Sequence, residues 1–348
     1  MAHLVLYRKY RPRVFRDIVG QPHVVTVLQN TLREGRVAHA YLFSGLRGTG
    51  KTTLARLFAK AINCEKLEAG NEKLEAAQTE PCNKCQICDA FNAGHAPDLI
   101  EMDAASTRGI DDIRELKEGV YVAPLRARKK VYVIDEVHML TKEAFNALLK
   151  TLEEPPDHAL FLFATTEPEK VPATILSRVT RFALRPVPAE LIEKRLQSLA
   201  KQEHIALASE AARVVARLAE GSLRDAETML GTLLDAFPGG VAEEEARLVF
   251  GLPKAALVGD LREALFARDR AKAFAVMQSG LAEGTDPRML ARMVAEDVRS
   301  MWKAKNFMHT EGSDILHTLA HAYPSRAEAI APELPLEVAI IELTKEKE

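Results

Sequence analysis

The clearest chemistry in this sequence lies in a glycine-rich segment that ends in a lysine and threonines. It fits the pattern Gly-x4-Gly-Lys-Ser/Thr, which is typical of a phosphate-binding loop between a strand and a helix. Glycines let backbone N–H groups surround phosphate oxygens, and the start of the next helix adds positive potential. Lys51 would reach the β- and γ-phosphates and the Thr52 hydroxyl would ligate Mg²⁺. A glycine-rich turn without ligand is the alternative. The predicted nucleotide-binding residues are Gly45, Leu46, Arg47, Gly48, Thr49, Gly50, Lys51, Thr52 and Thr53.

A second candidate site is a pair of acids after an apolar run, in Val131-Tyr-Val-Ile-Asp135-Glu136. Asp135 would hold Mg²⁺, directly or through water, and Glu136 could polarise the attacking water as a general base. The alternative is a strand that ends in solvated acids. A third apolar run ends in Thr165 and Thr166. The carboxyl ends of parallel strands face the ligand, so one of these threonines could orient the water or the γ-phosphate.

Four cysteines, the only ones in the chain, follow the spacing Cys64-x17-Cys82-x2-Cys85-x2-Cys88. Four thiolates so spaced suit a closed tetrahedral Zn²⁺ site with a structural role. An iron–sulfur cluster would share the Cys-x2-Cys-x2-Cys run, but the further Cys-Pro of the bacterial ferredoxin pattern is missing. Disulfides are disfavoured in a chain without an export signal. We therefore predict structural zinc.

The elements that must position these residues form an α/β region. Apolar runs at 40–45, 98–103, 130–136 and 159–166 alternate with helical periods, which predicts a parallel sheet covered on both faces. Leu54, Leu57, Phe58 and Ala61 form one helical stripe. From about 187 the strand signals end, and amphipathic helices are expected at 189–203, at 209–220 and from Ser222, followed by further helices beyond about 250.

Composition bounds the class of protein. With 348 residues and 47% hydrophobic residues the chain can bury a sizeable core, and wholesale disorder is excluded. The longest uncharged run, 18–32, is 15 residues, shorter than a membrane-spanning helix, so we expect a soluble, cytoplasmic protein. The net charge of −2 hides an asymmetry. Residues 1–60 contain 11 Lys and Arg against 2 Asp and Glu, which indicates an anionic partner or, equally, ordinary surface arginines.

Taken together, these phrases resemble the AAA+ ATPases, and more narrowly the tau/gamma clamp-loader subunits of bacterial DNA polymerase III. The resemblance covers about 1–235 closely, and the last hundred residues agree only in being helical. It rests on these phrases: YRKYRP (7–12), VGQ (19–21), HAYLFSG-x-RG-x-GKTT (39–53), DAAS (103–106), VYVIDEVHML (131–140), FNALLKTLEEPP (145–156), FATTEP (163–168), ILSR (175–178) and GSLRDA (221–226).

The resemblance implies three domains: an AAA+ nucleotide-binding domain at 1–186 with a zinc-binding insertion at 64–88, a helical lid at 187–250, and an all-helical oligomerisation collar at 251–348. It implies that Arg178 acts in trans on the γ-phosphate of a neighbouring subunit, although Val179 replaces the family's cysteine. It makes Arg224 a second sensor within the same subunit and Thr165 or Thr166 the first. The segment 7–20, with Arg11, Pro12, Val19 and Gly20, would line the adenine pocket.

The implied function is an ATPase motor subunit that loads a sliding clamp onto primed DNA for DNA polymerase III. ATP, Mg²⁺ and zinc would be its cofactors, and other loader subunits, the clamp, primed DNA and the polymerase core its partners. Arg108, at the expected start of the helix after DAAS, is a candidate DNA contact. The alternatives are an AAA+ helicase or branch-migration motor, a non-catalytic scaffold subunit of the same loader, and a P-loop kinase, for which no acceptor site is seen.

Overall fold

The first compact unit of the molecule is built on a five-stranded parallel sheet. The computed structural model describes residues 5–67, 79–107, 109–305, 310–323 and 331–345, and the chain divides into compact units at 1–238 and 239–348. The strands run in the order β2-β3-β4-β1-β5, and each neighbouring pair is parallel. Their bounds are β1 Ala40–Ser44, β2 Leu99–Asp103, β3 Lys130–Asp135, β4 Ala159–Thr165 and β5 Thr180–Ala183.

Four of these strands coincide with the predicted apolar runs, and β5 was not predicted. The central strand β4 is buried along its whole length, as expected for a strand covered on both faces. By contrast, β5 is a four-residue edge strand that pairs only with β1 and is largely exposed. Its sequence, Thr-Arg-Phe-Ala, has neither an apolar run nor strict alternation, so it carried no strand signal.

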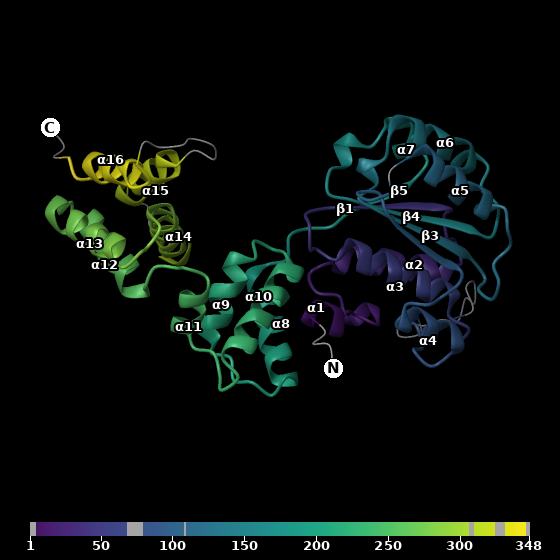
Figure 1. Cartoon of the computed structure of the whole chain (residues 1–348), viewed down its shortest axis with the longest axis horizontal. Helices are drawn as coiled ribbons and strands as arrows, with labels where there is room; N and C mark the ends of the chain where they lie inside the picture. Colours follow the sequence, from purple (N-terminus) through teal and green to yellow (C-terminus); the bar gives the residue numbers. More distant parts are fainter. Residues whose placement is uncertain (1–4, 68–78, 108, 306–309, 324–330, 346–348) are drawn as a thin grey trace. The chain divides into compact units, whose positions relative to one another are not determined.

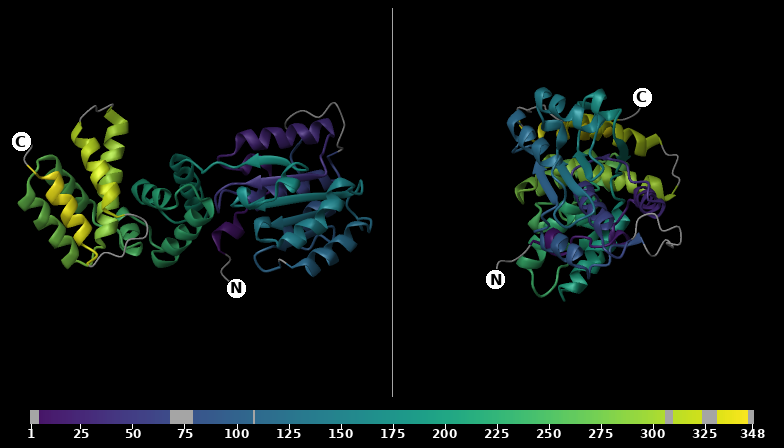
Figure 2. Two further views of the ribbon diagram at one scale, coloured as in Figure 1. Left: turned by 90° about the horizontal axis from the view of Figure 1, so that it is seen from above. Right: turned by 90° about the vertical axis from the view of Figure 1, so that its right-hand side faces the viewer.

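Helices cover both faces of the sheet (Figures 1 and 2). On one side lie α2 (Pro22–Glu34), α3 (Lys51–Asn63) and α4 (Gln86–Ala93), and on the other α5 (Ile110–Val120), α6 (Lys142–Glu153) and α7 (Ala173–Leu176). Strand side chains alternate between the layers because the strand period is two. Tyr41 and Phe43 pack in the α3 layer, whereas Leu42 packs in the α6 layer. The predicted stripe of α3 is buried: Leu54, Leu57, Phe58 and Ala61.

The rest of the first unit consists of short turns and three helices. The turns are α1 (Leu6–Lys9), η1 (Phe15–Asp17), η3 (Val137–Met139) and η4 (Pro168–Lys170), and the helices are α8 (Ala189–Gln202), α9 (Ser209–Leu218) and α10 (Leu223–Ala236). These three helices confirm the predictions for 189–203, 209–220 and the segment after Ser222. The Ser222 hydroxyl accepts a 3.2 Å hydrogen bond from the Asp225 N–H and so caps α10.

The second unit is helical throughout its described residues. Its helices are α11 (Glu243–Val249), α12 (Ala255–Phe266), α13 (Arg270–Ala282), α14 (Pro287–Lys305), α15 (Thr310–Ala322) and α16 (Leu334–Leu343). Leu261, Met277, Leu290 and Val294 are among its buried apolar side chains. Among the helices that the structure describes, none combines the length and apolar character needed to span a lipid bilayer.

Candidate nucleotide and metal sites

The glycine-rich loop joins the end of β1 to the start of α3, as the sequence predicted. Gly48 has a φ of +77° and Gly50 a φ of +101°, in the left-handed region that favours glycine. Gly48 is also required by space, because a Cβ there would lie 1.9 Å from the Ser222 hydroxyl oxygen. The N–H of Leu223 donates a 3.1 Å hydrogen bond to the Gly48 carbonyl. The start of α10 therefore rests directly on the loop.

Lys51 is the first residue of α3 and its side chain lies inside the loop. Its ammonium donates hydrogen bonds of 2.9 Å and 3.1 Å to the carbonyls of Gly45 and Leu46. Burial lowers the pKa of Lys51, and the nearby carboxylates of Glu136 and Asp135 partly offset this. The cation is thus held where a phosphate in the loop would meet it.

The two predicted magnesium ligands are in direct contact. Thr52 Oγ1 donates a 2.6 Å hydrogen bond to Asp135 Oδ2, which joins the first turn of α3 to the end of β3. Hard oxygen donors of this kind are the ligands that Mg²⁺ prefers, so the residues fit the ion. The register of the sheet explains the meeting, because β1, β3 and β4 all run parallel and end at the same edge.

The structure separates the roles of the two threonines after β4. Thr166 donates a 3.0 Å hydrogen bond from its hydroxyl and a 3.1 Å hydrogen bond from its N–H to Glu136 Oε2. Thr165 is fully buried, and its hydroxyl lies 2.9 Å from Nδ1 of His138. Glu136 itself has a φ of +46°, a conformation that costs energy for a non-glycine residue. Thr166 therefore contacts the candidate base, whereas Thr165 positions a histidine beside it.

A cavity of about 260 Å³ collects most of the predicted nucleotide-binding residues. Gly20, Gly45, Leu46, Thr165, Thr166 and Arg178 are not among its lining residues. Three lining residues were not predicted: Arg195, Leu223 and Glu227. Of these, Arg195 and Glu227 gave no signal because their spacing is that of ordinary helix surfaces. The full lining is Tyr7, Arg8, Arg11, Pro12, Asp17, Ile18, Val19, Arg47, Gly48, Thr49, Gly50, Lys51, Thr52, Thr53, Asp135, Glu136, Arg195, Leu223, Arg224 and Glu227.

Arg224 reaches the cavity from the first turn of α10. Its guanidinium carbon lies 4.8 Å from the centre of the Tyr7 ring, a cation–π distance. The hydrogen bond with Arg224 lowers the pKa of the Tyr7 phenol. Arg224 therefore lies beside the phosphate loop of its own chain and contacts Tyr7 of α1. This location is compatible with the predicted role within the same subunit.

A buried ion pair lies beside Arg224 in the same cavity. Arg195 Nε donates a 2.9 Å hydrogen bond to Glu227 Oε1, and Arg195 Nη2 donates one of 2.8 Å to the Tyr10 carbonyl. Burial raises the pKa of Glu227, and the charge of Arg195 only partly opposes the rise. These contacts join α8 and α10 to the segment that follows α1.

Arg178 lies outside this cavity, in a separate hollow that also contains His39 and Leu152. Its guanidinium donates a 2.6 Å hydrogen bond to Glu153 Oε1 and another to the Thr174 carbonyl. A role on the nucleotide of its own chain is therefore not supported by its position, and the predicted role in trans stays a prediction. Arg108 lies outside the described residues.

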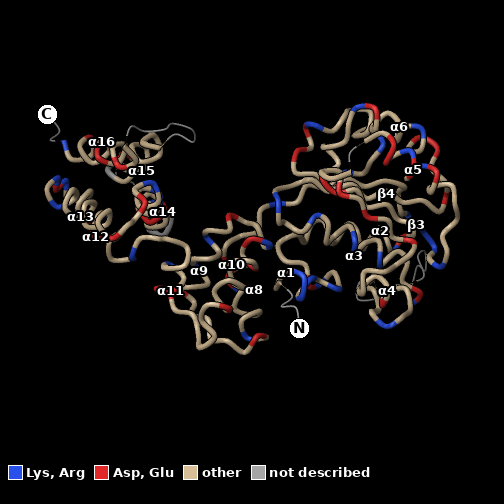
Figure 3. The backbone as a smooth tube through the Cα atoms, viewed as in Figure 1, with Lys and Arg blue, Asp and Glu red and all other residues tan. Residues whose placement is uncertain are grey.

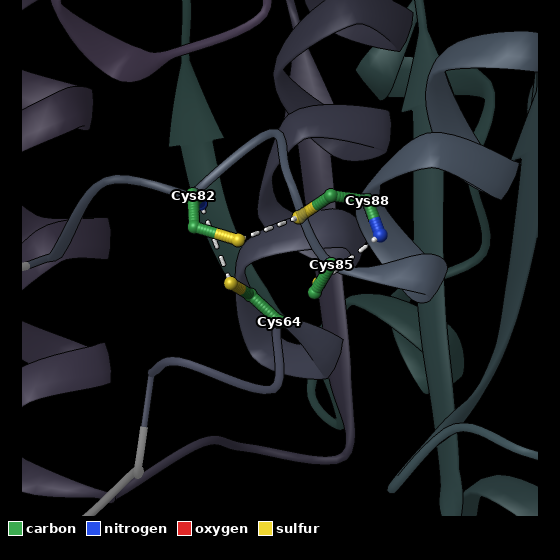
Figure 4. Close-up of side chains that lie close together, drawn as sticks. All are labelled: Cys64, Cys82, Cys85 and Cys88. Atoms are coloured by element: carbon green, nitrogen blue, oxygen red, sulfur yellow. Dashed lines mark hydrogen bonds between the residues drawn. The ribbon is translucent and has the colours of Figure 1, made fainter.

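The four cysteines come together as predicted (Figure 4). Their sulfur atoms all lie within 4.8 Å of one another, and those of Cys82 and Cys88 are 4.0 Å apart. A tetrahedral zinc with Zn–S bonds of about 2.3 Å separates its sulfurs by about 3.8 Å. The N–H groups of Cys82, Lys84 and Cys88 each donate a 3.4 Å hydrogen bond to a cluster sulfur. The donor set and geometry therefore fit a structural zinc ion.

The cysteine cluster is linked to the helix and strand that carry Thr52 and Asp135 by partly buried polar contacts. Cys64 directly follows Asn63, the last residue of α3, whose first turn carries Thr52. The Asn63 side chain donates 2.9 Å to the Lys129 carbonyl and accepts 2.8 Å from the Lys129 N–H, just before β3. The cluster thus lies where α3 ends and β3 begins, whereas Thr52 lies at the start of α3 and Asp135 at the end of β3. We call this link between the two elements the brace.

The fold and the loop together define a P-loop nucleotide-binding protein of the AAA+ type. The Thermotoga maritima RuvB Holliday junction branch migration motor is similar in structure, with a TM-score of 0.51 over 73% of this chain and 79% of that chain. At 17% sequence identity this similarity concerns the fold alone.

Comparison by sequence narrows the class to a family. The model of the family described as "DNA polymerase III, delta subunit" matches residues 20–188. DNA polymerase III subunit tau of Bacillus subtilis is 41% identical over 90% of this chain and 54% of its own length. The Escherichia coli subunit tau is 44% identical over 82% of this chain and 43% of its own. The chain belongs to the family of DNA polymerase III tau/gamma subunits, and it spans about half the length of these relatives.

Proposed function

We propose that the chain is the ATP-hydrolysing motor of a bacterial replicative clamp loader. The observation that carries this proposal is the 2.6 Å hydrogen bond between Thr52 Oγ1 and Asp135 Oδ2 at the mouth of the phosphate loop. A nucleotide-binding turn alone would not need an acid there. An acid bonded to the loop threonine is the arrangement that a magnesium nucleotide requires.

In the proposed reaction the chain positions ATP and water. Backbone N–H groups of the loop residues that line the cavity, Arg47 to Thr53, and the Lys51 ammonium bind the β- and γ-phosphates. Bound Mg²⁺, held by Thr52 and Asp135, would supply positive charge that neutralises the phosphate oxygens. Glu136 accepts the proton of the attacking water, and it is oriented by its two hydrogen bonds from Thr166. Arg11, Pro12, Val19 and Gly20 belong to the adenine end of the site.

Two arginines have proposed roles in sensing the nucleotide. Arg224 lies beside the loop of its own chain, so it would respond to nucleotide in cis and couple the cavity to α10. Arg178 lies outside that cavity and pairs with Glu153. We propose that it leaves this pair to contact the γ-phosphate of a neighbouring subunit, where a guanidinium can raise the rate by about 10³ to 10⁵.

The proposed assembly follows from the family. Residues 187–250 would act as a lid and 251–348 as a collar through which the subunit joins other loader subunits. ATP would favour the assembled state that opens a sliding clamp, and hydrolysis would release the clamp on primed DNA for the polymerase III core. We place this work in the cytoplasm. The cysteine cluster would hold structural zinc, since four protein ligands leave no position for water.

An ATPase assay with and without primed DNA and partner subunits tests the proposal. Hydrolysis by the assembled complex should be stimulated by primed DNA and clamp, and Glu136→Gln should lower it at least about 100-fold while nucleotide binding persists. Glu169→Gln, an exposed acid outside the cavity, is the matched control. Strand separation without clamp loading would indicate a helicase, and loading by a complex with Glu136→Gln at the normal rate would indicate a scaffold.

A further inference from the structure

Many basic residues at the start of the chain gather in one place, and the proposed function uses only Arg11 among them. The 11 Lys and Arg of residues 1–60 are met by only 2 acids in that segment. In the structure, six of them surround a second cavity, of about 470 Å³, next to the nucleotide cavity. Figure 3 shows this concentration of Lys and Arg around α1 and α3. We call this cavity the basic cleft; its cationic residues are Arg8, Lys9, Arg11, Arg13, Arg56 and Lys60.

Among the described residues, none that lines the cleft is acidic. Its other walls are Pro12, Thr53, Leu57 and the end of α4 with the following glycine, 91–94. The cations come from three parts of the fold: α1, the segment after it, and α3. Because these parts are brought together only by folding, the cleft is not a run of neighbouring side chains on one helix surface.

Acids from outside the lining neutralise only part of this charge. Lys9 pairs with Glu203 at 2.7 Å and Arg56 with Glu101 at 3.2 Å. Arg8, Arg11 and Arg13 have no ion pair among the residues that the structure describes. The pKa of Arg11 is lowered by burial first and by the neighbouring Arg56 second. The cations therefore repel one another, and a bound anion would relieve that repulsion.

The back of the cleft is rigid. Lys60 is 4% exposed, and its ammonium donates hydrogen bonds to the Arg13 carbonyl and to the side-chain oxygens of Asn83 and Asn92. Asn92 lies on α4, beside the cysteine cluster. Since these contacts hold α3, α4 and the 13–14 segment in one arrangement, the cleft exists before any ligand arrives.

We propose that the basic cleft binds the phosphodiester backbone of single-stranded DNA, as a contact additional to the one that clamp loading itself requires. Four of the six cations are arginines, whose planar guanidinium suits phosphate. The cleft offers little apolar surface on which a peptide could anchor side chains, because Leu57 and Phe91 are 2% and 7% exposed. The hollow is also too small to admit a duplex, whereas one strand's backbone needs only a run of cations.

The proposal rests on the proposed function in one respect: a clamp-loader subunit works beside DNA, so DNA is the expected polyanionic ligand. It predicts an anchor for a strand beside the nucleotide cavity, with Arg8, Arg11, Pro12 and Thr53 lining both cavities. ATP binding and DNA binding at the cleft can therefore be measured separately, through Lys51 and through the cleft arginines that do not line the nucleotide cavity. Arg13 and Arg56 are such residues.

The experiment measures fluorescence anisotropy of a labelled 30-nucleotide oligo-dT with the full, metal-loaded chain across a salt series. The double variant Arg13→Ala/Arg56→Ala should bind about tenfold more weakly at low salt. It should also lower the slope of log affinity against log salt by about 1.4, since each single-strand phosphate contact contributes about 0.7. The matched control, Arg33→Ala/Arg36→Ala, removes two cations from the same segment outside the cleft and should leave the slope unchanged.

An equal fall of the salt slope in the control variant would overturn the proposal. So would tripolyphosphate that displaces the oligonucleotide as well as unlabelled oligo-dT does at the same total charge. A poly-glutamate peptide that displaces it equally well would overturn the proposal too. Equal competition by a matched duplex would overturn the choice of a single strand. Arg13→Lys/Arg56→Lys should keep the slope, which separates lost charge from misfolding. Lys51→Ala should lose ATP and keep the cleft's DNA binding, so failure of the ATPase proposal and failure of this one are distinguishable.

Discussion

The two ends of α3 do different chemistry over 13 residues of one helix. At its start, Lys51 and Thr52 face a cavity, and the loop before them is shaped by glycines. At its end, Asn63 and Cys64 are fully buried and bonded to other elements. The start of the helix is suited to reversible binding of an anion, whereas its end is held permanently by packing and hydrogen bonds.

The difference shows how one helix serves both binding and stability. The amino end offers backbone N–H groups and a dipole that favours phosphate. The carboxyl end has no such affinity for anions. It is anchored instead by the Asn63 side chain, which bonds to the backbone of Lys129 just before β3, and by Cys64 in the cysteine cluster. If the two ends are independent, a change at the amino end should leave zinc content and stability unaltered, and a change at the carboxyl end should leave nucleotide affinity unaltered. If the brace matters, damage should pass from the carboxyl end to the amino end only.

The largest effect is expected at the carboxyl end. Cys64→Ser removes one of four metal ligands, and we expect bound zinc to fall toward zero. Stability should fall by on the order of 5 kcal/mol, a fraction of the roughly 10–16 kcal/mol that structural zinc contributes in small metal-dependent folds. Elemental analysis and thermal unfolding measure both. Lys84→Ala, an exposed change in the same module, is the control, and full zinc content in Cys64→Ser would contradict the assignment, as would iron in the unaltered chain.

The next largest effect is expected at the amino end. Lys51→Ala removes the cation that the loop encloses, and nucleotide affinity should fall about 100-fold, equal to about 3 kcal/mol. Titration with a fluorescent ATP analogue measures this. Zinc content and the unfolding temperature should stay close to those of the unaltered chain, because the cluster lies at the other end of the helix. Normal ATPase activity in this variant would refute the site.

A smaller effect should follow from cutting the link between α3 and β3. Asn63→Ala leaves the partly buried N–H and carbonyl of Lys129 without their partner, at a cost of about 2 kcal/mol. Denaturant unfolding measures the loss, and Asn30→Ala on α2 serves as the control. If the brace positions Asp135, nucleotide affinity in the presence of Mg²⁺ should fall several-fold in Asn63→Ala, whereas affinity without the ion should not. If Asn63→Ala binds the nucleotide as tightly as the unaltered chain both with and without Mg²⁺, the two ends of the helix are independent.

The smallest effect is expected in α10, at Glu227 in the wall of the nucleotide cavity. Burial raises the pKa of Glu227 above its unfolded value. The stability from this carboxyl is therefore fully present below the unfolded pKa of about 4.3 and is lost as pH rises through the folded pKa. The unfolding temperature of the unaltered chain minus that of Glu227→Gln should thus fall as the pH rises above about 4.3. Glu190→Gln, an exposed change on α8, should show no such trend, and a rising difference would contradict the assignment.

Sequence reasoning succeeded where chemistry depends on residues adjacent in the chain. The loop from Gly45 to Thr53 could be predicted because its backbone geometry needs glycines at fixed offsets, and the spacing of the cysteines restricts their ligand geometry in the same way. The apolar runs of β1, β3 and β4 predicted a sheet because a strand covered on both faces has no polar side to show. The edge strand β5 escaped prediction because partial exposure removes that pattern.

The sequence by itself therefore predicted the phosphate-binding type of loop, the cluster of four cysteines and the parallel sheet. Only the tertiary structure decided which threonine contacts Glu136, that Arg195 and Glu227 enter the nucleotide cavity, and that six cations from three elements meet in one cleft. The physical reason is distance along the chain. Local geometry and periodicity are written in neighbouring residues, whereas a contact such as that of Thr52 with Asp135 depends on how parallel strands and their helices pack.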